Sequence, residues 1–118
     1  MIAGIGLDII ELKRIEKLNN RLKRFRLRIL TLEETEIYEA LSGHRRTEFL
    51  AGRFAGKEAF AKARGTGIGA TCNFTDINIL PDDSGKPEIY FKGSPVTGFI
   101  SITHTQTVAA AQVILLKL

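Results

Sequence analysis

Residues 53–62 read Arg53-Phe54-Ala55-Gly56-Lys57-Glu58-Ala59-Phe60-Ala61-Lys62, which has the composition of a buried helix but carries four charges. At about 100° per residue, Arg53 and Lys57 fall on one stripe of such a helix, and Glu58 and Lys62 fall on another. The remaining helix surface is apolar, and charged residues are rarely buried unless they are paired or used. Spacing alone favours a structural Glu58–Lys62 pair one turn apart. The alternative is a charged functional site at the edge of the core.

Length and composition restrict the class of protein. The chain has 118 residues, of which 44% are hydrophobic, and this suits a single domain over residues 1–118. Cys72 is the only cysteine, so no internal disulfide can form and a reducing compartment, the cytoplasm, is expected. No apolar run reaches the roughly 20 residues of a membrane-spanning helix, so no membrane partner is expected. The net charge of +4 indicates an anionic partner.

Hydrophobic periodicity predicts an α+β fold with an N-terminal strand, three helices and then an antiparallel sheet. The first strand is expected over residues 2–10 and the helices over 11–30, 32–41 and 45–64, with a possible break in the first helix near Asn19-Asn20. A capping-box pattern, Thr31 followed three residues later by Glu34, predicts where the second helix begins. The four later strands are expected over 74–80, 88–92, 99–103 and 108–116, and Ser94 to Gly98 reads as a turn or short irregular segment.

Asp8 is an anomaly because it is a carboxylate inside an apolar strand, where it needs a cap, a cation or a metal as a partner. Capping the helix that follows is the simplest role. If strand and helix bring Asp8 and Glu58 together, they suit Mg²⁺, which prefers one or two carboxylates together with phosphate oxygens and water. Arg53, Lys57 and Lys62 could then bind phosphate oxygens.

Two further segments could approach a phosphate. Gly65-Thr66-Gly67-Ile68-Gly69 follows a predicted helix and lacks the Gly-Lys-Ser/Thr ending, so it is not a P-loop, although its backbone N–H groups could still bind an anion. Ser101-Ile102-Thr103-His104-Thr105 offers hydroxyls and an imidazole at the end of a strand. A lone histidine there could equally be a local hydrogen-bonding group.

Positive charge is concentrated in the first predicted helix. Eight of the chain's seventeen Lys and Arg residues lie there: Lys13, Arg14, Lys17, Arg21, Lys23, Arg24, Arg26 and Arg28. They could form a solvated face or a docking surface for an acidic partner. A small RNA-binding module is the competing interpretation, but tryptophan is absent and no aromatic RNA-binding motif is found. No nucleic-acid partner is therefore expected.

Three stretches together resemble the holo-acyl-carrier-protein synthases, the small bacterial class of 4′-phosphopantetheinyl transferases. They are Gly4-Ile5-Gly6-Leu7-Asp8, residues 49–62, and residues 101–105, and their order and separation match the family over the whole chain. The resemblance implies transfer of 4′-phosphopantetheine from coenzyme A to a serine of apo acyl carrier protein. It also implies release of adenosine 3′,5′-bisphosphate and a role in fatty acid biosynthesis.

The resemblance implies roles for individual residues. Asp8 and Glu58 would bind Mg²⁺, Lys62 would lie near the transferring β-phosphate, and Glu58 or a metal-bound water would take the serine proton, which makes these three the catalytic candidates. The residues implied to contact coenzyme A are Arg53, Lys57, Lys62, Gly65, Thr66, Gly67, Thr103, His104 and Thr105. Those implied to dock the acidic carrier are Arg14, Arg21, Arg24 and Arg28.

The family is typically a homotrimer that binds coenzyme A between subunits, and the same assembly is implied here. A catalytically idle binder of coenzyme A or a nucleotide is the other alternative, but both carboxylates and Lys62 are present. Two features depart from the family pattern. Gly56 stands where relatives often have alanine, and residues 93–98 hold Pro95 and two glycines where many relatives have a short helix.

Overall fold

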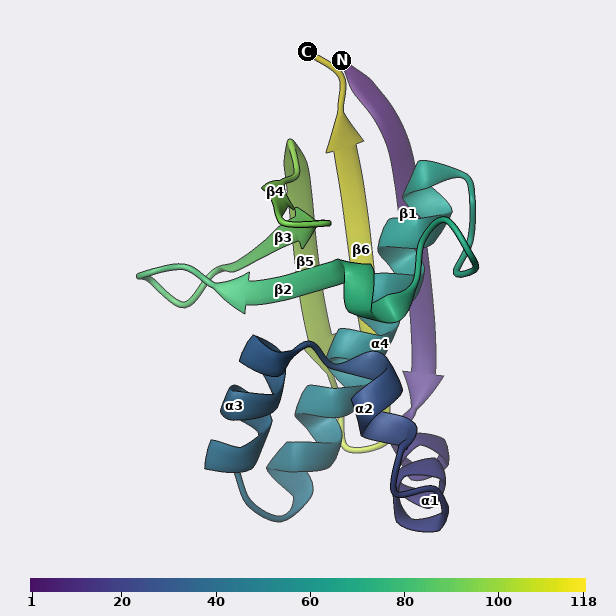
Figure 1. Ribbon diagram of the computed structural model, residues 1–118, viewed down its shortest axis with the longest axis vertical. Helices are drawn as coiled ribbons and strands as arrows, with labels where there is room; N and C mark the ends of the chain where they lie inside the picture. Colours follow the sequence, from purple (N-terminus) through teal and green to yellow (C-terminus); the bar gives the residue numbers. More distant parts are fainter.

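The longest strand, β1 (Ile2–Glu11), pairs antiparallel with β6 (Val108–Leu116), and β6 pairs with β5 (Gly98–His104). In the computed structural model, which describes residues 1–118, this sheet packs against the long helix α4 (His44–Arg64) (Figure 1). Asp8, Ala111 and Ile102 lie in one row across the three strands. The α+β class predicted from the sequence is confirmed.

The side of α4 that faces the sheet is built from small residues. Alanine recurs at every fourth position, at Ala51, Ala55, Ala59 and Ala63, and all four are buried. A Cβ atom at Gly6 of β1 would overlap the Ala59 carbonyl oxygen, so glycine is needed for the strand and the helix to lie this close. The helix ends at Arg64, and the Gly65 that follows has a φ of 86°, the left-handed conformation typical of a residue that terminates a helix.

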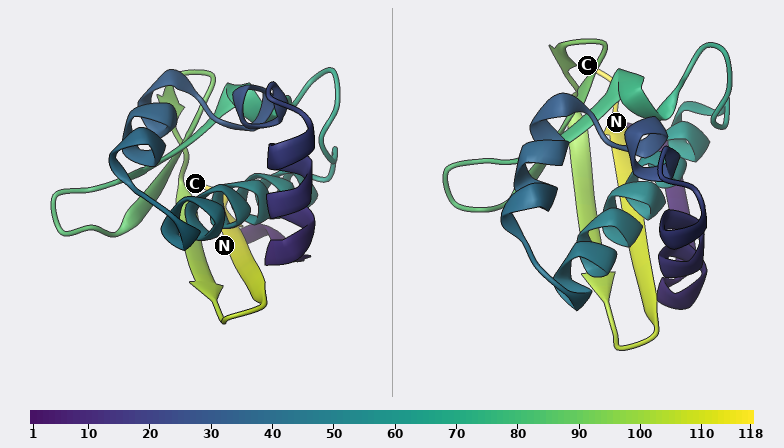
Figure 2. Two further views of the ribbon diagram at one scale, coloured as in Figure 1. Left: turned by 90° about the horizontal axis from the view of Figure 1, so that it is seen from below. Right: turned by 60° about the horizontal axis from the view of Figure 1, so that its bottom comes forward.

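The basic segment after β1 forms two helices, α1 (Leu12–Arg21) and α2 (Phe25–Ile29). The backbone becomes extended at Leu22, so the break falls at residues 22–24 rather than near Asn19-Asn20. The chain therefore has four α-helices where three were expected. The right-hand view in Figure 2 shows α4 lying across the sheet, with α1 on one flank and α3 (Leu32–Ala40) on the other.

The capping box predicted at Thr31 is confirmed. The Thr31 hydroxyl accepts a hydrogen bond from the Glu34 backbone N–H, and the Glu34 carboxylate accepts one from the Thr31 N–H in return. This reciprocal pair starts α3 at Leu32 and draws the Glu34 side chain back toward the interior.

A second antiparallel sheet contains β2 (Ile77–Pro81), β3 (Pro87–Phe91) and the short β4 (Ser94–Pro95). The 3₁₀ turn η1 (Phe74–Asp76) occupies the start of the predicted strand over 74–80. Residues 94–95, expected to be irregular, pair with β3 through the two-residue turn Lys92-Gly93. Both turn residues have positive φ values, of 50° and 86°, which is the backbone geometry of a tight hairpin.

The two faces of the β1–β6–β5 sheet differ in their surroundings. The inner face contributes Ile10, Ile100 and Val113 to the hydrophobic core beneath α4. The outer face exposes apolar side chains at Ile5, Leu7, Ile9 and Phe99, which are 57%, 61%, 64% and 53% exposed. At the β5 edge of this face, Lys86 Nζ lies 5.3 Å from the centre of the Phe99 ring. No helix is both long and apolar enough to cross a membrane.

Candidate functional site

Asp8, Glu58 and Lys62 form one cluster where β1 meets α4. The Lys62 ammonium donates hydrogen bonds to Asp8 Oδ1 and to the Leu7 carbonyl, each over 3.0 Å. The close approach permitted by the β1 glycines places these groups within reach of each other. Lys62 therefore pairs with Asp8 on the neighbouring strand and not with Glu58 one turn away, so the structural pair favoured by spacing alone is wrong.

The cluster combines a partly buried pair of carboxylates with an accessible ammonium. The Asp8 side chain is 16% exposed, whereas that of Lys62 is 51% exposed. Loss of hydration raises the pKa of Glu58, the nearby Asp8 charge raises it further, and Lys62 opposes both effects. A cation near Glu58 would relieve the repulsion between the two carboxylates.

The donor set of this cluster fits Mg²⁺. No group of three or more His, Cys, Asp or Glu side chains could hold a metal by itself. Two carboxylates match the requirement of Mg²⁺, which completes its coordination with water and substrate phosphate oxygens. A structural zinc site, which takes four protein ligands, does not fit.

A second cluster lies on the β5 side of α4. A hollow of about 190 Å³ is lined by Leu41, Arg45, Glu48, Phe49, Gly52, Arg53, Ile102 and His104. Arg53 Nε donates to the Ile79 carbonyl over 3.1 Å, and its guanidinium carbon lies 4.4 Å from the centre of the Phe49 ring. Burial lowers the pKa of Arg53, and the Glu34 carboxylate opposes that shift. His104 Nδ1 lies 3.2 Å from Glu48 Oε2.

Sequence reasoning missed two residues of this hollow, Arg45 and Glu48. Both lie on the face of α4 that carries Phe49, Gly52 and Arg53, at the spacings i, i+3, i+4, i+7 and i+8. That spacing was available in the sequence.

Lys57, predicted to contact a phosphate of coenzyme A, does not join either cluster. Its side chain is fully buried, and its ammonium donates to Glu34 Oε1 and to the Ile29 carbonyl, each over 2.6 Å. The prediction is corrected on this point, because the ammonium has protein acceptors in the core and no access to a ligand. Glu34, 23 residues earlier, was not recognised as its partner.

The other residues predicted to contact coenzyme A are divided between the two ends of α4. Gly65, Thr66 and Gly67 follow its C-terminus, where Thr66 is exposed and its hydroxyl donates to the Gly67 carbonyl. Thr103 and Thr105 are exposed near the end of β5. The Thr105 hydroxyl accepts hydrogen bonds from the backbone of Thr107 and Val108, which fixes the turn into β6.

One chain therefore does not gather the predicted residues into a single cleft. Asp8 is on the edge strand β1 and His104 is on the opposite edge strand β5, with β6 between them. The two edges are separated by two strand spacings, about 10 Å, and α4 lies over the space between them. The two clusters consequently open toward opposite edges of the sheet.

The four arginines predicted to dock a carrier are all exposed on α1, α2 and the turn between these helices. They are Arg14, Arg21, Arg24 and Arg28. None of them forms an ion pair within the chain, so their charges are available to a partner. Arg26, by contrast, donates to Asn19 and lies over the Tyr38 ring.

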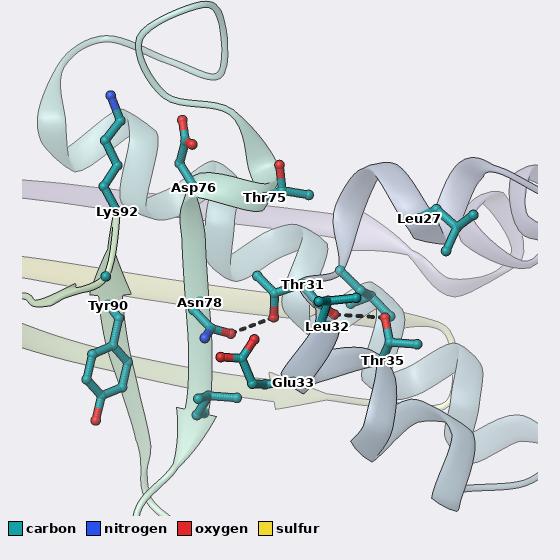
Figure 3. A pocket seen from close by; sticks show the side chains of 13 residues that line it. Leu27, Thr31, Leu32, Glu33, Thr35, Thr75, Asp76, Asn78, Tyr90 and Lys92 are labelled. Atoms are coloured by element: carbon teal, nitrogen blue, oxygen red, sulfur yellow. Dashed lines mark hydrogen bonds between the residues drawn. The ribbon is translucent and has the colours of Figure 1, made fainter.

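A larger hollow of about 780 Å³ lies apart from both clusters, between the start of α3 and the β2–β3 sheet (Figure 3). Its lining includes Leu32, Glu33, Asn78, Tyr90 and Lys92, and it contains no residue predicted for the site. The Thr31 hydroxyl donates to Asn78 Oδ1 at its floor. We therefore regard the Asp8–Glu58–Lys62 cluster as the candidate catalytic site, because its two carboxylates and its ammonium lie close together at the border of the core.

Comparison with known proteins identifies the class. Residues 4–114 match the family described as the 4′-phosphopantetheinyl transferase superfamily. The holo-[acyl-carrier-protein] synthase of Bacillus subtilis is 56% identical over 119 residues, covering 100% of this chain and 98% of the relative. The enzyme of the same name from Geobacillus is 52% identical over 118 residues, covering 100% of this chain and 99% of the relative.

Solved structures of proteins with the same name share the fold of this chain. A holo-(acyl-carrier-protein) synthase from Bacillus anthracis, in complex with CoA (3′,5′-ADP), has a TM-score of 0.86 and 49% identity, covering 98% of this chain and 96% of that one. The Helicobacter pylori synthase in complex with coenzyme A has a TM-score of 0.83 and 31% identity, covering 95% and 99%. The chain thus belongs to the 4′-phosphopantetheinyl transferase superfamily. Within it, the full-length relatives place the chain in the holo-[acyl-carrier-protein] synthase family, as the sequence resemblance predicted.

Proposed function

We propose that the protein transfers the 4′-phosphopantetheine group of coenzyme A to a serine of apo acyl carrier protein and releases adenosine 3′,5′-bisphosphate. The observation that carries this proposal is the Asp8–Glu58–Lys62 cluster, found in a chain whose family acts on carrier proteins. Positioning and charge stabilisation are the main requirements of phosphoryl-type transfer, and such a cluster supplies both.

The serine oxygen attacks the β-phosphorus of coenzyme A, and the bond from that phosphorus to the bridging oxygen breaks. Glu58 would accept the serine proton, directly or through a water, because it is the carboxylate of the cluster that does not already pair with Lys62. Lys62 has an exposed ammonium that stabilises negative charge on the transferring phosphate or on the leaving group. Asp8 holds Lys62 in place through their 3.0 Å contact.

Mg²⁺ is the proposed cofactor, with Asp8 and Glu58 as its protein ligands. When bound, it would neutralise charge on the pyrophosphate of coenzyme A. This role is supported by the proximity of the two carboxylates: loss of hydration raises the pKa of Glu58 most, and the nearby Asp8 charge raises it further.

The hollow around Arg53 is proposed to hold a phosphate of coenzyme A other than the one transferred. Arg45, Arg53 and His104 supply its donors, and an arginine guanidinium suits phosphate oxygens geometrically. Gly65 to Gly67, Thr103 and Thr105 remain proposed contacts along the cofactor's length.

The acidic carrier is proposed to dock on Arg14, Arg21, Arg24 and Arg28. Their exposure and lack of internal ion pairs support this role. Charge complementarity would steer the carrier to the cluster beside β1 and make its association sensitive to salt.

A homotrimer with active sites between subunits is the proposed assembly. Two observations support it: the uncovered apolar face around Leu7 and Ile9, and the opening of the two clusters toward opposite sheet edges. In a closed ring, the β1 edge of one subunit would meet the β5 edge of the next. Fatty acid biosynthesis in the cytoplasm is the proposed setting.

The proposal is tested by incubating the protein with coenzyme A, Mg²⁺ and an apo acyl carrier protein, and measuring carrier mass and release of adenosine 3′,5′-bisphosphate. We expect one phosphopantetheine adduct per carrier and an equal amount of the nucleotide. A carrier whose acceptor serine is replaced by alanine is the matched control. Absence of any adduct on several bacterial carriers would overturn the proposal.

A further inference from the structure

Glu34 and Lys57 are the only charged side chains that are fully buried, and every charged atom of the pair is engaged. Glu34 Oε1 accepts from Lys57 Nζ over 2.6 Å and from the Thr31 N–H over 2.9 Å. Glu34 Oε2 accepts from the Ile79 N–H over 2.7 Å, and Lys57 Nζ also donates to the Ile29 carbonyl. The pair therefore joins four segments: the end of α2, the start of α3, α4 and β2.

Stability alone does not account for such a pair. The cost of removing two charges from water often equals or exceeds their attraction, and apolar residues of similar volume frequently replace a buried ion pair without loss of stability. Burial lowers the pKa of Lys57, and the Glu34 carboxylate opposes that shift. Loss of hydration and ionic attraction therefore act against each other at this pair. The geometry around the pair indicates what else it does.

The peptide groups of Ile79 connect the pair to the hollow beside β5. The Ile79 N–H donates to Glu34, and the Ile79 carbonyl accepts from Arg53 Nε over 3.1 Å. Arg53 and Lys57 are one turn apart on α4, so the helix and the edge of β2 are linked at two consecutive turns. If Glu34 released the Ile79 N–H, the pairing of β2 with β3 would remain, but the acceptor that orients Arg53 would lose its restraint on the side of α4.

The Ile79 carbonyl thus orients the Arg53 guanidinium through its Nε. Arg53 Nε donates to the Ile79 carbonyl and its guanidinium carbon lies over the Phe49 ring, 4.4 Å from the ring centre, while its two terminal nitrogens have no acceptor in the chain. These nitrogens belong to a side chain that lines the hollow together with Arg45 and His104. A guanidinium held by its Nε presents a fixed pair of donors, and this suits a phosphate.

We infer that Glu34 and Lys57 are positioning residues for Arg53, so that this buried ion pair sets the affinity of the hollow for a phosphate of coenzyme A. The inference rests on the proposed function only for the identity of the ligand. The pair touches no ligand itself, because both side chains are fully enclosed by protein.

The test is a double-mutant cycle on coenzyme A binding. The dissociation constant is measured by calorimetry for the wild type, for the neutral pair Glu34→Gln/Lys57→Met, for Arg53→Met, and for all three changes together. We expect the neutral pair to weaken binding about tenfold, as for a lost charged hydrogen bond. We expect no further loss when the neutral pair is added to Arg53→Met, because the pair acts through Arg53.

A purely structural role gives a different pattern. It predicts the same fold-change in both backgrounds, or wild-type binding by the neutral pair, and either result overturns the inference. Val113→Ala, a buried change in β6 away from this network, is the control for loss of stability and should leave binding unchanged. If this neutral pair does not fold, Glu34→Gln/Lys57→Gln, which is also uncharged and keeps hydrogen-bonding groups at both positions, replaces it in the same cycle.

The wild-type protein is also tested for transfer to apo carrier in the same preparation. If the wild type binds coenzyme A but transfers nothing to the carrier, the proposed function is wrong. The mutant cycle still tests the positioning role, because it measures coenzyme A binding alone. Successful transfer with an additive cycle removes only the positioning role. The two failures are therefore distinguishable.

Discussion

Glu58 shares a small volume with a second carboxylate, so its titration depends on its neighbours. In metal-free buffer we expect Glu58 to titrate above the ordinary range for glutamate, because hydration loss and Asp8 both raise its pKa. Asp8→Asn should lower the midpoint and Lys62→Met should raise it, since Lys62 opposes the shift. The measurement is a carboxyl-carbon NMR titration with Glu58 assigned.

The sign of the stability effect follows from the same shift. A carboxyl whose folded-state pKa is raised favours the folded state most below its unfolded pKa, and this contribution is lost as the pH rises through the folded pKa. In metal-free buffer, Glu58→Gln should therefore abolish this decrease. The free energy of unfolding should then change less with pH between the unfolded-state and folded-state pKa of Glu58. A curve unchanged by Glu58→Gln would show that the carboxyl titrates normally.

Removal of either carboxylate tests the site itself. Asp8→Asn and Glu58→Gln are each expected to lower turnover by at least about a hundredfold, because charge stabilisation and proton transfer are of this size. Circular dichroism and the melting temperature should stay close to wild type, since both side chains lie at the border of the core. Near-wild-type turnover in either variant would remove that residue from the chemistry.

Sequence reasoning succeeded at this scale where a residue was out of character with its surroundings. Asp8 in an apolar strand and Glu58 in an apolar helix were both conspicuous, and the structure brings them together. It failed for Lys57, because the position of Glu34 in space depends on tertiary packing that no local spacing reveals. Periodicity showed that Lys57 lies on an apolar helix but could not say whether its charge points outward.

At the scale of elements, the site depends on how closely β1 lies against α4. Gly6→Ala should destabilise the protein by at least about 2 kcal/mol, because its Cβ would overlap the Ala59 carbonyl oxygen and the backbone would have to move. Chemical denaturation measures the change. Gly69→Ala is the matched control, since its Cβ meets nothing within 4 Å, and it should change stability by no more than about 0.5 kcal/mol.

Most elements were predictable because their signals are local. The Thr31 capping box fixed the start of α3, and residues 108–116 were assigned to a strand with the bounds of β6. The hairpin at Lys92-Gly93 was missed because a lysine rarely adopts a positive φ. The exact break between α1 and α2 was also missed, since Leu22 continues the helical apolar pattern while its backbone is extended.

At the scale of the whole molecule, positive charge is gathered at one end. The N- and C-termini lie at the opposite end from α1 (Figure 1). Arg24→Glu should weaken carrier binding at least about tenfold at low salt and leave coenzyme A binding unchanged. Lys117→Glu makes the same change in net charge near the C-terminus and should have little effect on the carrier. Carrier affinity is measured by surface plasmon resonance at two salt concentrations, which distinguishes a local docking surface from an effect of net charge. An equal loss of carrier affinity in both variants would exclude a defined docking surface.

The opposite openings of the two clusters make the assembly testable by mixing subunits. Asp8→Ala disables the carboxylate cluster and leaves the Arg53 hollow intact, whereas Arg53→Ala does the reverse. Each variant alone should have little activity. If every active site takes one cluster from each of two neighbouring subunits, co-expressed variants form some sites with both intact clusters.

Random assortment in a ring gives about a quarter of such sites, so the mixture should recover about a quarter of wild-type turnover. Mixing Asp8→Ala with Glu58→Ala is the control, because both changes disable the same cluster and no site can recover. The assembly is checked by light scattering, and Leu7→Glu on the exposed apolar face should dissociate it. If the complementing mixture stays as inactive as the control while remaining assembled, each site is built from a single chain, and the two clusters do not share one coenzyme A across a subunit boundary.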